Sequence, residues 1–236
     1  MKRIVFLLGA ALVAFAGNRV LADEGVRSGS LALASENLAQ GKKNVVIDGM
    51  FYETKQGRVL LPLTELATNR RLEHQFKMPD GRTVKLSVKR DDDDYLVNLR
   101  ASEDADITKW GFAIRADNSE YFTGLMERVV DGRQQASWAP GIKEGMDLRG
   151  QKVDMILKPT TSVYAPFYLS SIGYAVFVQG DWPGYFDFCS DDPQRVKVEF
   201  EGASFAVKIY TAKTPAELVK AHAADAGLRK HLRHGA

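Results

Sequence analysis

The strongest constraint on the fold is the alternation of apolar and polar residues in several short runs. The run at 84–88 alternates in this way, and the runs at 196–200 and 205–209 repeat the pattern. A period of two residues places one face of a strand on a core and the other face in water. Turn sequences separate the runs, and Pro79-Asp80-Gly81 indicates a hairpin. The sequence therefore predicts an all-β fold, a large antiparallel β-sandwich.

One segment near the end of the chain has helical rather than strand periodicity. Thr214 suits the N-cap, Pro215 suits the first helical position, and Glu217 stands three residues after Thr214. This is a capping box, and apolar residues follow it at helical spacing. Gly227 is expected to end the helix. The sequence thus predicts one short C-terminal helix, from Thr214 to Asp225.

Composition limits the classes of protein to which the chain can belong. It is 45% hydrophobic, which is typical of a globular rather than a disordered chain. Its 32 Lys and Arg residues are nearly balanced by 30 Asp and Glu residues, so we expect no nucleic-acid partner. The single cysteine, Cys189, can form no disulfide within the chain. It lies in an aromatic run, and we expect a buried, unreactive thiol.

The first residues have the pattern of a secretory signal peptide. Lys2 and Arg3 precede a short apolar stretch at 4–16, and Val20-Leu21-Ala22 offers a cleavage site. The apolar stretch is too short to cross a bilayer comfortably, which disfavours a membrane anchor. We therefore expect export to the periplasm or the extracellular space, with no membrane association after cleavage. The expected divisions are a signal peptide at 1–22, a sandwich at 23–227 and an unpacked tail at 228–236.

The sequence contains no Walker loop, dinucleotide-binding glycine pattern, HExxH or GxSxG motif, and we expect no cofactor and no metal. His231 and His234 stand three residues apart, but in the tail, where we expect them to be solvated. The acidic run 91–94 lacks the Gly and Glu that a calcium loop needs at its sixth and twelfth positions. It predicts a solvated turn between two strands.

Tryptophans are candidates for contact with sugars, because their faces stack on sugar rings. Trp110, Trp138 and Trp182 are the three in the chain. Trp138 lies in 129–146, a segment without clear periodicity and long for a loop, which indicates a functional or mobile loop. Trp182 lies in a turn rich in glycine and proline. Each can equally pack against its own sandwich.

Four segments in order carry a resemblance to a known family. They are residues 122–128, 164–178, 183–188 and 214–219. With them the chain resembles glycoside hydrolase family 31, which contains α-glucosidases and α-xylosidases. The resemblance implies a sandwich of the galactose-mutarotase-like kind, a supersandwich that forms the N-terminal domain. In that family a (β/α)8 barrel follows the sandwich and carries the catalytic aspartates.

Few residues follow Val219, whereas a barrel takes about 250. We therefore expect a non-catalytic domain whose partners are a (β/α)8 barrel and a carbohydrate. The segment 151–159 resembles a family loop that supplies an aspartate to the sugar pocket, but Pro159 stands at the aspartate's place. Substitute sugar contacts are then expected from four nearby residues: Asp147, Arg149, Lys158 and Trp138. Turn chemistry for Asp147 and a solvated strand end for Lys158 are the plainer alternatives.

Two other functions remain open on the sequence. A free-standing carbohydrate-binding module would use exposed tryptophans in a groove. A mutarotase-type sugar epimerase would need an acid and a base facing one groove, typically Glu with His. His74 and His222 are the only histidines outside the tail, and neither lies in a motif. An orphaned barrel interface would instead expose apolar residues, with Ile156 and Leu157 among the expected contributors.

Overall fold

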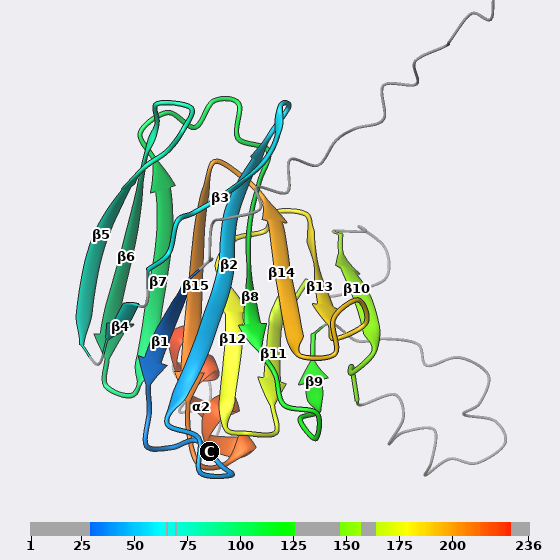
Figure 1. Ribbon diagram of the computed structural model, residues 1–236. Helices are drawn as coiled ribbons and strands as arrows, with labels where there is room; N and C mark the ends of the chain where they lie inside the picture. Colours follow the sequence, from blue (N-terminus) through cyan, green and yellow to red (C-terminus); the bar gives the residue numbers. More distant parts are fainter. Residues whose placement is uncertain (1–28, 65, 69, 126–146, 157–163, 228–236) are drawn as a thin grey trace, which may run out of the picture.

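The computed structural model of the protein describes residues 29–64, 66–68, 70–125, 147–156 and 164–227 (Figure 1). Two sheets lie against each other, and their facing side chains form one large core. All but one of the strand pairs are antiparallel, the exception being the pair of β1 with β4. The predicted all-β antiparallel sandwich is confirmed.

The first sheet has eight strands. In spatial order they are β10 (Gln151–Met155), β13 (Gly184–Phe188), β14 (Arg195–Glu201), β8 (Lys109–Arg115), β2 (Asn44–Thr54), β1 (Ser30–Ala34) and β4 (Leu66–Thr68), with β3 (Gly57–Leu60) paired to β2.

The second sheet has seven strands. In spatial order they are β5 (Arg71–Lys77), β6 (Thr83–Asp91), β7 (Asp94–Ala101), β15 (Ser204–Thr211), β12 (Tyr174–Val178), β11 (Phe167–Ser170) and β9 (Phe122–Gly124).

The alternating runs face the core as their period predicts. On β6, Val84, Leu86 and Val88 are buried, while Lys85 and Lys89, which alternate with them, are exposed and Ser87 is half-buried. The same period explains why Trp110 does not serve as a stacking platform. It points inward from β8, is fully buried, and lies 5.7 Å from the Tyr52 ring, centroid to centroid. Of the two alternatives for Trp110, the structure shows packing within its own sandwich.

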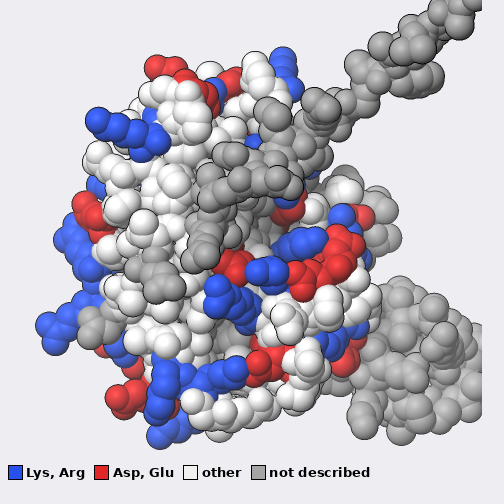
Figure 2. All heavy atoms as spheres, in the orientation of Figure 1, with Lys and Arg blue, Asp and Glu red and all other residues white. Residues whose placement is uncertain are grey.

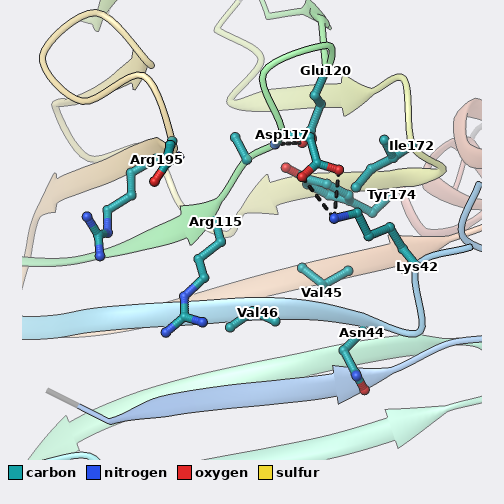
Figure 3. Close-up of a pocket in the computed structure, with 12 residues that line it drawn as sticks. Lys42, Asn44, Val45, Val46, Arg115, Asp117, Glu120, Ile172, Tyr174 and Arg195 are labelled. Atoms are coloured by element: carbon teal, nitrogen blue, oxygen red, sulfur yellow. Dashed lines mark hydrogen bonds and ion pairs between the residues drawn. The ribbon is translucent and has the colours of Figure 1, made fainter. Parts of the chain in front are cut away.

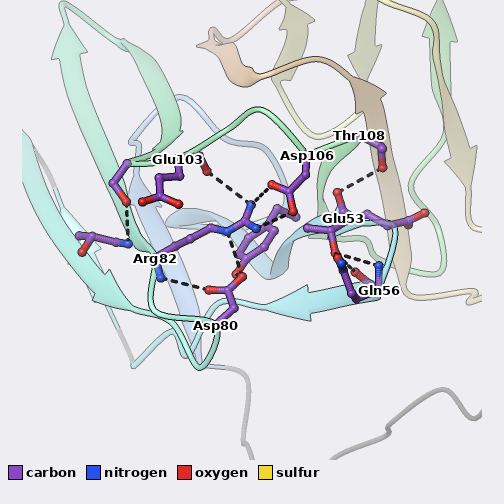
Figure 4. Close-up of polar contacts among 12 residues, drawn as sticks. Glu53, Gln56, Asp80, Arg82, Glu103, Asp106 and Thr108 are labelled. Carbon is purple, nitrogen blue, oxygen red and sulfur yellow. Dashed lines mark hydrogen bonds and ion pairs between the residues drawn. The ribbon is translucent and has the colours of Figure 1, made fainter.

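The predicted turns occur where the sequence places them. The hairpin between β5 and β6 closes with the Met78 N–H donating to the Arg82 carbonyl at 2.8 Å, and Gly81 has a φ of 88°, which favours glycine. Arg82 then ties this hairpin to its surroundings (Figure 4). Its guanidinium lies 3.1 Å from Asp80 and 2.6 Å from Asp106, and the Tyr52 hydroxyl donates to Asp80 at 2.6 Å.

The acidic run between β6 and β7 forms a tight turn, with Asp91 paired to Asp94 across it. Cys189 is buried, as expected, and burial raises the pKa of its thiol to about 11. The thiol therefore stays protonated at neutral pH. Among the described residues, no group of three or more His, Cys, Asp or Glu side chains could hold a metal ion. No helix within the described ranges is long and apolar enough to cross a membrane.

The helix α2 (Pro215–Asp225) begins at the predicted capping box. The Thr214 hydroxyl accepts the Glu217 N–H at 3.3 Å, and the Glu217 carboxylate accepts the Thr214 N–H at 3.1 Å. Gly227 follows the helix with a φ of 77°. Leu218 buries its side chain in a small cluster with Phe167 and neighbours on the outer face of the seven-stranded sheet. The short C-terminal helix is confirmed.

Candidate functional site

A polar pocket of about 510 Å³ lies where residues of both sheets meet (Figure 3). The start of β2, the end of β8 and the start of β14 contribute its basic and amide side chains. The β8–β9 connection, two valines of β2, the β11–β12 turn and the start of β12 contribute the rest. The pocket is lined by Lys42, Asn44, Val45, Val46, Arg115, Ala116, Asp117, Glu120, Ile172, Tyr174, Gln194 and Arg195.

Glu120 is a fully buried carboxyl group in the wall of this pocket. The Ser170 hydroxyl donates to one of its oxygens at 2.5 Å, and the Asp117 N–H donates to the other at 3.0 Å. Burial raises the pKa of Glu120, because the charged form loses its hydration. Burial also raises the pKa of the Tyr168 and Tyr174 phenols, both close to Glu120, well above the ordinary value. This wall of the pocket therefore favours the protonated state of Glu120 and of the two phenols.

The rim carries two arginines that share one buried carboxylate. Arg115 Nε lies 3.0 Å from Asp48, and Arg195 Nε lies 3.2 Å from the same group. Arg195 also pairs with Asp192 at 2.7 Å. The two arginine side chains remain 55% and 44% exposed, and a guanidinium has five N–H donors. Donors therefore remain available to a polar ligand that enters the pocket.

Asp147 and Arg149, two of the four predicted sugar contacts, lie beside this pocket rather than in it. Asp147 Oδ1 accepts the N–H groups of Phe122 at 3.3 Å and of Arg149 at 2.9 Å. The Arg149 guanidinium donates to the carbonyls of Asp117, Glu120 and Pro193 at 2.9, 2.7 and 2.8 Å. Arg149 thus fixes the two connections that carry Asp117, Glu120 and the neighbouring Gln194 into the pocket. Contact of these two residues with a sugar stays a prediction.

Trp138 and Lys158, the other two predicted contacts, lie outside the described residues, as does Leu157. Trp182 is 51% exposed, and its ring lies against the backbone at Gly202. The Tyr164 hydroxyl donates to the Trp182 carbonyl at 2.6 Å and so holds this turn in place.

The two histidines outside the tail lie on different elements. The His74 ring lies beside Phe76 on β5, with ring centroids 4.5 Å apart and the ring planes tilted by 52°. His222 lies on α2, where it stacks on Phe167 at 4.0 Å, and its Nδ1 is 3.3 Å from the Tyr210 hydroxyl. Neither lines the pocket that holds Glu120. The structure therefore pairs neither histidine with this buried glutamate.

Sequence reasoning missed the residues that build the pocket. Glu120 follows a turn, and nothing in the local pattern marks it as buried rather than solvated. Ser170 and Tyr174 fall within a segment that resembles family 31, which was the one signal available. Arg115 and Arg195 stand at strand ends, where an exposed charge is ordinary. Only the pairing of β8 with β14, which places Arg115 opposite Arg195, brings the two arginines together.

No known family's sequence pattern matches the chain, and no curated protein matches it. Solved structures do match it. A family 31 sulfoquinovosidase from E. rectale, in complex with an aza-sugar inhibitor, has a TM-score of 0.56 and is 15% identical, over 78% of this chain and 32% of that chain. A family 31 dextranase from Flavobacterium johnsoniae, complexed with glucose, has a TM-score of 0.40 and is 13% identical, over 66% and 27%.

The part matched amounts to about a third of the sulfoquinovosidase chain. At such low identity the likeness shows the fold alone. That fold is a β-sandwich found in enzymes of the family that the sequence motifs resemble.

Proposed function

We propose that the chain is the non-catalytic, N-terminal sandwich of an exported α-glycosidase of family 31 type. The observation that carries this proposal is the likeness in fold to part of the sulfoquinovosidase, over 78% of this chain. The four motifs between residues 122 and 219 support it independently, because they follow one another in the order found in that family.

In this role the sandwich packs on a (β/α)8 barrel and lines one side of a carbohydrate pocket. Ile156 is the candidate contact with the barrel, because it is 50% exposed directly after the edge strand β10. Asp147 and Arg149 stand at the other end of that strand, where the connection from β9 arrives. We place them as supports of the carbohydrate-facing side, since their hydrogen bonds fix β9 and the connections on either side of the pocket.

Hydrolysis tests the non-catalytic assignment. The purified chain should release no nitrophenol from nitrophenyl α-glucoside or α-xyloside above a buffer control, because the acids that cut the bond belong to the barrel. Turnover that rises with protein concentration and survives further purification would overturn the proposal.

Trp182 favours a second candidate, a free-standing carbohydrate-binding module. An exposed indole held by a fixed turn can stack on a sugar ring. Titration with neutral glucans distinguishes the two functions. Binding that disappears in Trp182→Ala, while the fold is kept, favours the module. Absence of binding in the wild-type chain favours the barrel-packing domain.

A further inference from the structure

The outer face of β5, β6 and β7 places like charges directly opposite each other. Arg71 pairs in register with Lys89, and Lys85 pairs in register with Arg100. Like charges opposite each other across strands destabilise a sheet. These four side chains are all exposed, so no burial in the core requires them to be cationic. Their placement suggests a role outside the stability of the sheet.

A row of short polar side chains separates the two cationic pairs. Ser87 pairs in register with Asn98, between the Lys85–Arg100 and Arg71–Lys89 pairs. Lys85 and Lys89 stand four residues apart on β6, which corresponds to roughly 13 Å along a strand. Lys85, Ser87, Asn98 and Arg100 line a hollow of about 310 Å³, and Arg71 and Lys89 line a second one of about 540 Å³. We call this face the basic trough, and it carries Arg71, Lys85, Ser87, Lys89, Asn98 and Arg100.

The acidic residues near the basic trough do not neutralise it. Glu73 accepts both Arg71, at 2.5 Å, and Lys85, at 3.3 Å. No ion pair joins Lys89 or Arg100 to an acidic side chain within the described part of the chain. Asp92 also lines the second hollow, together with Arg70 and Arg90, so positive charge still exceeds negative charge along the trough. Figure 2 shows Lys and Arg side chains gathered on the left of the molecule, where Figure 1 places β5 and β6.

We propose that the basic trough binds an acidic polysaccharide, with its sulfate or carboxylate groups on the two cationic pairs. Ser87 and Asn98 would then accept and donate hydrogen bonds to the sugar hydroxyls between those groups. A chain of sugars fits this arrangement better than a nucleic acid, because the uncharged Ser87 and Asn98 between the cationic pairs match sugar hydroxyls, which a row of phosphates does not offer. The choice of a saccharide rests on the proposed function.

The test measures binding of the full chain to dextran sulfate, polygalacturonate, neutral dextran and duplex DNA at low salt. We expect binding to one or both acidic glycans, weakened by added salt because exposed charges are screened. Tighter binding of dextran sulfate indicates recognition of sulfate groups, and tighter binding of polygalacturonate indicates recognition of carboxylate groups. The double variant Lys85→Gln, Arg100→Gln should bind about fivefold or more weakly, from the typical contribution of exposed charges. The matched control Lys213→Gln, Lys220→Gln removes the same charge beside and on α2 and should bind as the wild type does.

Thermal unfolding of the same proteins without ligand shows whether weaker binding reflects a loss of stability instead of a loss of the binding charges. The trough variant should melt at the wild-type temperature or above it, because removal of the like-charge pair offsets the loss of the exposed Lys85–Glu73 ion pair. Four outcomes would each overturn the proposal that the trough binds an acidic polysaccharide. Two concern specificity: the control variant binds as weakly as the trough variant, or duplex DNA binds as tightly as the glycans. The other two are that neither acidic glycan binds, or that the trough variant melts at a lower temperature than the wild type. The proposed function would survive these outcomes, since it is tested by the glycosidase assay and at Ile156.

Discussion

Glu120 is a carboxyl group held away from water, and its titration should shape how stability depends on pH. Burial raises its pKa above the ordinary value of 4.5. A raised carboxyl pKa contributes stability that is present in full below pH 4.5 and is lost as the pH rises through the folded pKa. The variant Glu120→Gln cannot ionise, so it should lose less stability than the wild type as the pH rises from 4.5 through neutrality. Urea unfolding across that range measures the difference.

Glu103→Gln is the control for this prediction, because Glu103 is exposed in the connection between β7 and β8. Its profile should run parallel to that of the wild type. If Glu120→Gln also runs parallel, Glu120 ionises in the folded protein as freely as in the unfolded chain, and the prediction is wrong.

Substitution of Arg149 distinguishes two roles for this residue, a structural brace and a direct contact with a sugar. Its guanidinium donates to three carbonyls on two different connections. Arg149→Met removes these charge-assisted bonds and should lower the free energy of unfolding by about 2 kcal/mol, measured in urea. Arg70→Met is the matched control, because Arg70 is exposed on the short connection between β4 and β5. Unchanged stability in Arg149→Met together with weaker sugar binding would favour the direct contact instead.

At the scale of single residues, the sequence predicts which side chains face the core but not which polar groups form hydrogen bonds with each other. The alternation on β6 places Val84, Leu86 and Val88 inward correctly, since it depends only on the period of a strand. The contact of Ser170 with Glu120 joins residues 50 positions apart. No local pattern specifies such a pair, because it depends on how distant strands are arranged. Trp110 shows the same limit, because residue type alone suggested a sugar contact where strand direction places a core residue.

At the scale of the element, α2 depends on one buried leucine. Leu218 is fully buried, whereas its neighbour Val219 is 48% exposed. Leu218→Ala should lower the free energy of unfolding by about 3 kcal/mol, since it leaves a cavity beneath the helix. Val219→Ala should change it by less than about 0.5 kcal/mol, as exposed positions usually do. Urea unfolding measures both, and equal effects would show that the helix does not dock as described.

The helix was predictable because its signals are local, from the capping box to the glycine that follows it. The hairpin at Pro79-Asp80-Gly81 was predictable for the same reason. The order of strands was not, because β14 pairs with β8 and β15 with β7 across long stretches of chain. Only the resemblance to family 31 indicated the arrangement of the whole sandwich.

At the scale of the whole molecule, the edge of the eight-stranded sheet carries exposed apolar side chains. β10 is the edge strand, and Met155 at its end pairs with Gly184. The next residue, Ile156, is therefore close to the turn that holds Trp182, and the two side chains are 50% and 51% exposed. Exposed sheet edges and apolar patches promote association between chains.

We therefore expect the isolated chain to self-associate, and the double variant Ile156→Ser, Trp182→Ser to shift it toward the monomer. Sedimentation velocity over a range of protein concentrations measures the shift. Val219→Ser removes a similarly exposed apolar side chain from α2 and should leave the association unchanged. A wild-type chain that stays monomeric at high concentration would contradict the proposed barrel interface at this edge. It would instead favour the binding module, in which Trp182 is exposed in order to meet a sugar.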